Sequence, residues 1–315
     1  MRNVKDYAQL FLKGVAMGGA DIIPGVSGGT IAFITGIYER LLNAIKSVDA
    51  EAVKLLTTLR LKEFWQHIDG KFLITLLSGI LLSILSLANL MSFLLVAYPI
   101  QLWSFFFGLI VIASFSVVRE IKRWNGGVLL AGFIGIAVAY FVTTATPAET
   151  PTTLWFIFLS GAIAICAMIL PGISGSFILL IMGKYTYIIN ALKELDLLTI
   201  IVFALGCVVG LLSFARVVSW LLKRYHGIAI SLLAGFMLGS LNKIWPWKVI
   251  TTYRIDSHGE QQPFLTENIL PIEYVALTGQ EPFLLQALLF ALLGVSIVVI
   301  LEKIASHNKR ATKTA

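Results

Sequence analysis

Long apolar runs separated by short polar stretches extend over the whole chain of 315 residues. Runs of roughly 17 to 25 apolar residues are the signature of helices that cross a membrane. We therefore expect one membrane-spanning helix for each of six uninterrupted runs. These runs lie at about 72–97, 101–118, 127–145, 197–222, 228–245 and 283–302.

Two further apolar segments, residues 8–38 and 153–190, are each interrupted by a motif that breaks a helix. The first motif is PGVSGGT, which begins at Pro24, and the second is PGISGSF, which begins at Pro171. Proline stops an incoming helix, glycine allows the chain to reverse, and serine is a preferred N-cap of the helix that follows. Each segment is therefore either a re-entrant hairpin or a pair of full spans.

The composition agrees with a membrane protein. Hydrophobic residues make up 58% of the chain and charged residues only 13%, whereas a soluble protein carries about 25% charged residues. We therefore predict an all-α polytopic membrane protein. The net charge of +7 does not indicate a nucleic-acid partner, because basic residues at the edges of a membrane are what sets topology.

The basic residues also predict an orientation. Nineteen of the 24 Lys and Arg residues fall in four segments: the stretch up to residue 71, the loop 119–123, the loop 216–224 and the tail from residue 303. Because cytoplasmic loops are rich in Lys and Arg, we expect these segments and both termini in the cytoplasm. Interfacial helices at about 39–66 are then cytoplasmic, and the loop at about 246–282 is extracytoplasmic.

The sequence contains an internal repeat. Identical residues recur at an offset of 147 through the two broken segments and at an offset of 127 through the spans that follow. We divide the chain into a first repeat (1–147), a second repeat (148–304) and a basic tail (305–315). Each repeat holds three full spans, so the second copy is inverted relative to the first. Inverted repeats with broken helices are typical of secondary transporters.

The two motifs form a candidate site for an anion. A helix N-terminus presents free amides and a positive dipole end, and we expect the inverted repeats to bring two such tips together. The tip residues are Gly25, Ser27, Gly28, Gly29 and Thr30 in the first copy, and Gly172, Ser174, Gly175 and Ser176 in the second. The alternative is that the glycines only let helices pack closely.

Charged residues within apolar segments are expensive and are functional candidates. Arg216 is a candidate phosphate ligand, although it can also reach the membrane surface as a snorkelling side chain; its repeat partner is Asn89. Asp21 is a candidate carrier of a coupling proton, or a cap for backbone amides. Glu39 is a second coupling candidate. Arg40 and Lys184, which lie where the broken segments return to the surface, are secondary candidates, and so is Asn89.

The stretch GADIIPGVSGGTIAFITGIYERL and the second motif LPGISGSFILLIMGKY resemble a prokaryotic membrane family that was first known as a domain of unknown function. This family is now regarded as polyprenyl-phosphate transporters of the PopT type, and the resemblance covers essentially the whole chain. It implies a protein of the bacterial inner membrane that returns undecaprenyl phosphate, the lipid carrier for cell-wall glycans, from the outer to the inner leaflet. We expect no enzymatic activity and no cofactor, and the expected partners are polyprenyl phosphate and membrane lipids.

Two alternatives belong to other classes. Phosphatases of lipid pyrophosphates also have inverted repeats and a similar tip, but their arginine position is Gly28 in one copy here and Gly175 in the other. The four histidines lie outside the broken segments, so no phosphohistidine candidate is near the tips. A channel for small anions is the third possibility. We expect no metal site, because Cys166 and Cys207 lie in apolar segments and behave as small hydrophobic residues.

Overall fold

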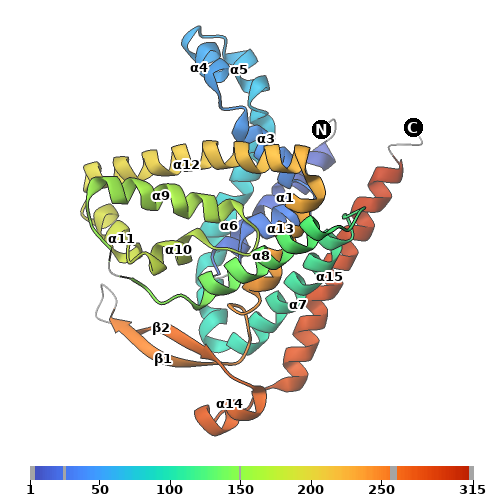
Figure 1. The fold of residues 1–315 in the computed structure, drawn as a ribbon, viewed down its shortest axis with the longest axis vertical. Helices are drawn as coiled ribbons and strands as arrows, with labels where there is room; N and C mark the ends of the chain where they lie inside the picture. The colour runs from blue at the N-terminus through green and yellow to red at the C-terminus, as the bar shows by residue number, and fades with distance from the viewer. Residues whose placement is uncertain (1–3, 24–25, 149, 256–260, 312–315) are drawn as a thin grey trace. The chain divides into compact units, whose positions relative to one another are not determined.

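The computed structural model describes residues 4–23, 26–148, 150–255 and 261–311 and is mostly helical (Figure 1). The elements of the first part of the chain are α1 (Val4–Asp21), α2 (Gly28–Ile34), α3 (Tyr38–Lys46), α4 (Ala50–Thr57), α5 (Leu61–His67), α6 (Gly70–Ala97), α7 (Pro99–Val118) and α8 (Gly126–Thr144). The elements that follow are α9 (Leu154–Ile169), α10 (Gly175–Ile181), α11 (Tyr185–Lys193), α12 (Leu197–Arg224), α13 (His226–Ser240), β1 (Lys248–Ile255), β2 (Gln261–Asn268), α14 (Pro271–Thr278) and α15 (Leu284–Ala311).

Each of the six expected spans coincides with a helix. Among the described residues, α6, α7, α8 and α12 are long and apolar enough to cross a membrane, and α13 and the apolar part of α15 are shorter. α13 was expected to reach residue 245 but ends at Ser240, because the chain turns directly afterwards. The chain is therefore a multi-pass membrane protein with four full-length spans, or five if the bent pair α10 and α11 forms one span.

The repeat is visible in the boundaries of the helices. α2 and α10 have seven residues each, α3 and α11 have nine each, and both pairs are 147 positions apart. α6 and α12 have 28 residues each and are 127 positions apart. The change of offset has a structural cause: α4 and α5 are inserted between α3 and α6, and no helix intervenes between α11 and α12.

The compact parts of the structure do not coincide with the repeats. One unit combines the chain up to Met91 with Ser114–Ser240, and the other combines Ser92–Ala113 with the chain from Leu241 onward. Each unit takes segments from both halves of the sequence. The division at residue 147 therefore describes the repeat in the sequence rather than two independently packed bodies.

In the first unit, helices pack through glycines. α9 lies along α12 (Figure 1), and a Cβ on Gly206 would collide with the carbonyl oxygen of Phe158. α8 and α13 meet in the same way, since a Cβ on Gly135 would lie 3.0 Å from the Cα of Gly235. Small residues permit such close backbone approach between membrane helices, where association depends on van der Waals packing.

The expected interfacial segment 39–66 forms three short helices, α3, α4 and α5. α4 and α5 project as an arm beyond α3 (Figure 1). Asp49 caps α4 by accepting a hydrogen bond from the amide of Ala52, and this bond lowers the pKa of its carboxyl group. His67 at the end of α5 lies 3.1 Å from the same carboxylate, so the two ends of the arm are joined.

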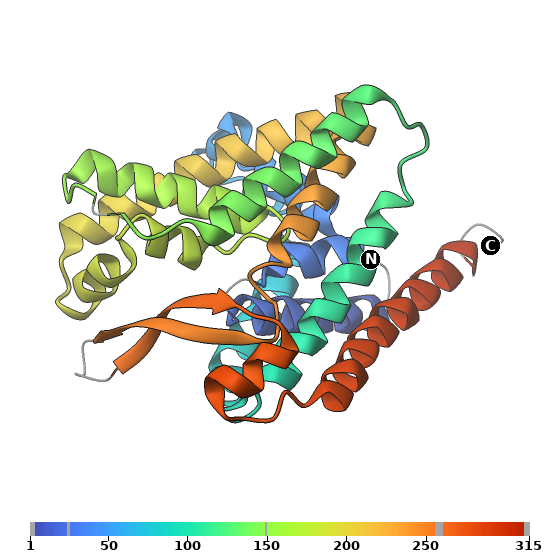
Figure 2. The same cartoon turned by 60° about the horizontal axis from the view of Figure 1, so that its bottom comes forward.

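In the second unit, the loop 246–282 is not wholly irregular. It forms the antiparallel hairpin of β1 and β2, followed by α14 (Figure 2). The hairpin is the one departure from an all-helical fold within the described residues. At its base, the amine of Lys248 lies 4.1 Å from the centre of the Trp103 ring. Burial, together with the charge of Lys243, lowers the pKa of Lys248 to about 7.

Candidate functional site

Each interrupted segment is a hairpin with a short return helix. α9 ends at Ile169, the chain reverses through Gly172, whose φ of +88° favours glycine, and α10 returns against α9. Seven residues of helix extend only about 10 Å, which is too short to cross a bilayer. α2 has the same length and packs against α1. α10 and α11 together are long enough to span but are bent by 105°, so the second segment is either a re-entrant loop or a broken span.

In the first tip, side chains of the chain itself accept hydrogen bonds from the first amides of α2. Ser27 is the N-cap of α2, as predicted, and its hydroxyl oxygen accepts a hydrogen bond from the amide of Gly29 at 3.1 Å. The amide of Gly28 donates to the carboxylate of Asp21 at 2.7 Å. Asp21 therefore caps backbone amides, which was one of its two predicted roles. Gly25 lies outside the described residues.

Hydroxyl groups of the first hairpin reach the end of α9. Ser27 contacts the carbonyl oxygens of Met168 and Leu170, both at 3.4 Å. The phenol of Tyr38 donates to the carbonyl oxygen of Ile169 at 3.2 Å. The last carbonyl groups of a helix have no partner within it. Here Tyr38 donates to one of them, and the single hydroxyl proton of Ser27 is shared between two others.

A fourth contact joins the turns themselves. The amide of Gly172 donates to the hydroxyl oxygen of Thr30 at 2.9 Å, and both residues are buried. Thr30 is fully buried and Ser27 is only 1% exposed. The structure thus brings the two predicted tips into direct contact. It also shows that the hydroxyl groups of the first tip hold this junction.

The second tip differs from the first. Ser174 occupies the N-cap position of α10, but its hydroxyl does not cap the helix as the parallel with Ser27 had suggested. Instead, the hydroxyl groups of Ser174 and Ser176 are 2.9 Å apart. Ser174 is buried and Ser176 is exposed. Glycines also pack here, since a Cβ on Gly175 would lie 2.6 Å from the carbonyl oxygen of Ala164.

Arg216 lies on a different surface. Its guanidinium donates to the carbonyl oxygens of Leu212, one turn back in α12, and of Val48, just beyond α3, both at 3.3 Å. It therefore interacts with the connector after the first hairpin rather than with a tip residue. Its repeat partner Asn89 is exposed on α6. The snorkelling alternative fits this exposed arginine better than a site between the tips.

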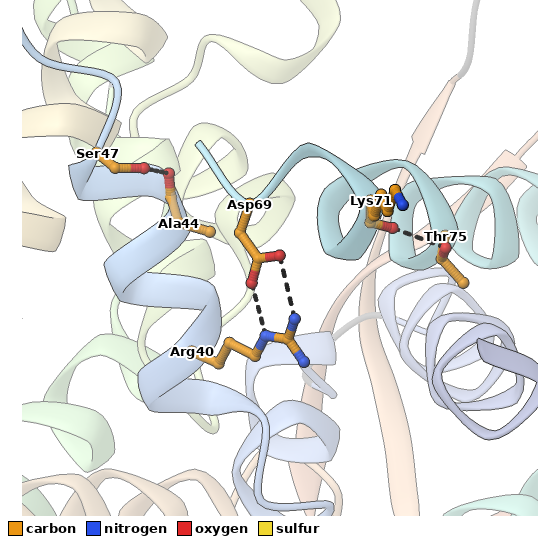
Figure 3. A network of polar contacts seen from close by, with 6 residues as sticks. All are labelled: Arg40, Ala44, Ser47, Asp69, Lys71 and Thr75. Atoms are coloured by element: carbon orange, nitrogen blue, oxygen red, sulfur yellow. Dashed lines mark hydrogen bonds and ion pairs between the residues drawn. The ribbon is translucent and has the colours of Figure 1, made fainter. Parts of the chain in front are cut away.

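The secondary candidates are held by structural contacts. Arg40 forms a bidentate ion pair with Asp69, at 2.7 and 3.1 Å (Figure 3), and lies 4.4 Å from the ring centre of Phe72. Lys184 is 2% exposed and donates to the carbonyl oxygen of Thr150 at 2.6 Å. Arg40 and Lys184 thus stabilise the chain where the two broken segments return to the surface.

Glu39 is exposed and lines a cavity between α3 and α12. The sequence alone does not predict this cavity, because its two walls come from segments that lie far apart in the chain. Tyr38, whose phenol bonds to the end of α9, was not among the predicted site residues. The signal in the sequence for this contact was the phenol of a tyrosine at the start of a short helix.

Two broken hairpins that meet at their tips, within a bundle of apolar helices, define the class of the protein as a membrane transporter. The comparisons with known proteins agree. Residues 17–262 match the model of the undecaprenyl phosphate translocase-like family, and the chain belongs to this family. It is a transporter rather than an enzyme, because the family and its named relatives are transporters.

Two relatives carry the name polyprenyl-phosphate transporter. The protein from Vibrio cholerae is 48% identical over 300 residues, which cover 95% of this chain and 97% of the relative. The protein from Staphylococcus aureus is 31% identical over 254 residues, which cover 75% and 85% respectively. No solved structure matches the chain.

The junction between the tips predicts the effect of one substitution. Thr30→Val preserves the shape of the side chain but leaves the buried amide of Gly172 without its acceptor. We expect a loss of about 1–3 kcal/mol in stability, measured by thermal unfolding in detergent. Thr75→Val is the matched control, because the exposed hydroxyl of Thr75 bonds only within its own helix. Equal stability of the two variants would contradict the role of Thr30.

Proposed function

We propose that this chain transports polyprenyl phosphate, and in particular undecaprenyl phosphate, from the outer to the inner leaflet of the bacterial cytoplasmic membrane. The printed names of the family and of both relatives support this substrate. The structural observation that supports it most directly is the contact between the two tips, through Thr30 and Gly172. Such a junction provides polar backbone and hydroxyl groups in the middle of an apolar bundle, where a phosphate group requires them.

The second tip is the better candidate for contact with the phosphate. Ser174 and Ser176 offer two hydroxyl groups next to the first amides of α10, and Ser176 is exposed. In the first tip, by contrast, the amides of Gly28 and Gly29 already have acceptors. An anion is favoured at the start of a helix by the amides and the dipole. The isoprenoid chain can remain in lipid, since only the phosphate needs polar partners.

Asp21 gives the first tip a means of responding to the substrate. Its carboxylate occupies the amide of Gly28, a donor that a phosphate oxygen also accepts from. Protonation of Asp21 weakens its hold on this amide, because a charged acceptor forms the stronger hydrogen bond. We therefore propose that Asp21 alternates with the substrate and carries the coupling proton. Arg216, on α12 beside the end of α3, is in our proposal a cation outside the tips.

The orientation of the chain also remains part of this proposal. Equal lengths of the helices in the two halves support an internal repeat. If the shorter helices α13 and α15 are counted as spans, each half has three spans, which makes the second copy inverted. The distribution of Lys and Arg supports cytoplasmic termini. The two tips then approach each other from opposite sides of the membrane, as in other transporters built from inverted repeats.

Transport is tested with the full chain in liposomes that contain fluorescent polyprenyl phosphate. Wild-type protein should move the lipid between leaflets, as measured by quenching from outside. The double variant Ser174→Ala/Ser176→Ala should slow this movement about tenfold or more, because two hydroxyl donors to a charged group are lost. Ser213→Ala is the control, since its exposed hydroxyl bonds only within α12. If the wild-type protein moves the lipid between leaflets no faster than empty liposomes do, the proposed function is refuted.

Asp21→Asn tests the coupling role. The asparagine side-chain oxygen still accepts from the amide of Gly28, but the group no longer binds or releases a proton. We expect binding of the lipid phosphate to persist while net transport driven by a pH gradient falls to the level of empty liposomes. Gradient-driven transport at the wild-type rate would show that the proton travels elsewhere.

Single cysteines test the orientation, in a chain without Cys166 and Cys207. A cysteine at Thr152 should react with an impermeant thiol reagent added outside intact cells. A cysteine at Gly126 should react only after the cells are opened. Both positions are exposed, so a difference in labelling reports the side of the membrane. The reverse pattern would contradict cytoplasmic termini.

A further inference from the structure

The cavity that Glu39 lines, between α3 and α12, lies in the first unit and is partly polar. Its volume is about 310 Å³, and its lining residues are Glu39, Leu42, Asn43, Ser219, Leu222, Lys223 and His226. This volume is at the lower end of the range for small-ligand sites, so the cavity accommodates a head group rather than a long chain. The Ser219 hydroxyl, 3.4 Å from the side-chain oxygen of Asn43, connects the two walls.

The wall contributed by α12 has a regular polar face. Arg216, Ser219 and Lys223 are spaced by three and four residues, so they lie on one side of the helix. Arg216 contacts the carbonyl of Val48 and Ser219 contacts Asn43, so this side faces α3. Lys223 continues the face into the cavity, where it offers an ammonium group with three hydrogen-bond donors.

The other cavity groups suit a phosphate. His226 presents ring nitrogens that donate when protonated, and Ser219 adds a hydroxyl that is 4% exposed. Lys223 and His226 are both exposed, and within the described part of the chain no ion pair links either of them to Glu39. The ammonium group of Lys223 and the imidazole of His226 are therefore available to a ligand that enters from outside.

Neighbouring aromatic residues indicate the depth of the cavity. Trp220 and Tyr225 are exposed, and their ring centres are 5.7 Å apart in an edge-on arrangement. Exposed Trp and Tyr residues are enriched where a membrane meets water. A lipid can thus place its head group among Ser219, Lys223 and His226 and its chain against the outer face of α12.

From these observations we infer that the cavity between α3 and α12 is a second binding site for a phosphomonoester head group, which the lipid occupies at the cytoplasmic surface before release. The lipid source and the cytoplasmic side rest on the proposed function; the phosphate chemistry does not. α3 connects this site to the tips, because Tyr38 at its start bonds to the end of α9 and the next residue, Glu39, lines the cavity.

Glu39 has a distinct role in this site. Its carboxylate faces the same cavity as Lys223 and His226, and it repels a bound phosphate. A site on a transport route must bind well enough to fill and weakly enough to empty. Glu39 therefore limits the affinity and promotes release of the lipid.

The test uses Asn43→Cys as a local reporter in the full chain without native cysteines. Asn43 is exposed and lines the cavity. The rate of its alkylation is measured in detergent with increasing farnesyl phosphate, and farnesol, inorganic phosphate and phosphatidylglycerol are the comparison probes. Farnesyl phosphate should slow the alkylation at the lowest concentration. Equal protection by farnesol would refute a phosphate site, and equal protection by inorganic phosphate or phosphatidylglycerol would refute a site for a lipid phosphomonoester.

Charge variants in the reporter chain give opposite expected shifts. Lys223→Gln and His226→Gln should each raise the half-protecting concentration of farnesyl phosphate, by about tenfold for Lys223, which is the size of one charge-assisted hydrogen bond. Glu39→Gln should lower it about threefold or more. Arg224→Gln is the matched control, because Arg224 is an exposed basic neighbour of Lys223 that does not line the cavity. Equal shifts of this concentration for Arg224→Gln and Lys223→Gln would show that general surface charge causes the effect. That result would refute a direct contact between Lys223 and the phosphate.

The liposome assay separates this inference from the proposed function. Transport without protection of the cysteine at position 43 would overturn the second site and leave the transporter intact. Protection without transport would support the phosphate site and overturn the proposed function. The tip variant Ser174→Ala/Ser176→Ala should slow transport and leave the protection unchanged.

Discussion

The architecture depends on one constraint, the backbone groups that become unpaired where α9 ends inside an apolar bundle. In hydrocarbon, each unpaired group costs several kcal/mol. The first hairpin removes this cost, because Ser27 and Tyr38 contact three carbonyl groups and Thr30 accepts from the amide of Gly172. The two hairpins are therefore not independent gates. Any movement that separates them exposes four polar groups, so a transport cycle has to replace these contacts or keep them.

The packing of the later helices ties the two halves of the chain together in a second way. α13, from the second half, packs against α8, from the first, where Gly135 meets Gly235. In the other unit, a Cβ on Gly108 of α7 would collide with the carbonyl of Ala291 in α15. The third helix of each half thus pairs with the second helix of the other half. Some glycines pack within one repeat, as Gly206 does against Phe158, but Gly135 and Gly108 pack against helices from the other half of the chain.

The sequence predicted the elements well because each depends on local chemistry. Long apolar runs define α6, α7, α8 and α12, and the serine of the first motif caps α2 as its pattern indicated. The sequence was less informative about which groups contact one another in the fold. Nothing near Ser174 reveals that its hydroxyl pairs with Ser176 instead of capping α10. Likewise, the contact between Arg216 and Val48 joins residues 168 positions apart. The cavity at α3 and α12 was missed for the same reason.

The two tips have diverged in a way that suits a single substrate. If both tips had open amides, a phosphate would have two competing positions, and the empty one would remain unsatisfied. Here Asp21 satisfies the amide of Gly28 from within the chain, whereas Ser174 and Ser176 bond to each other. A pair of hydroxyl groups can turn toward a ligand at small cost, because rotation about a single bond exchanges one partner for another. Removal of a carboxylate from an amide requires a proton or a competing anion. In the proposed function, the same motif thus gives a second tip whose hydroxyl groups turn toward the phosphate and a first tip whose amide becomes free only when the charge of Asp21 changes.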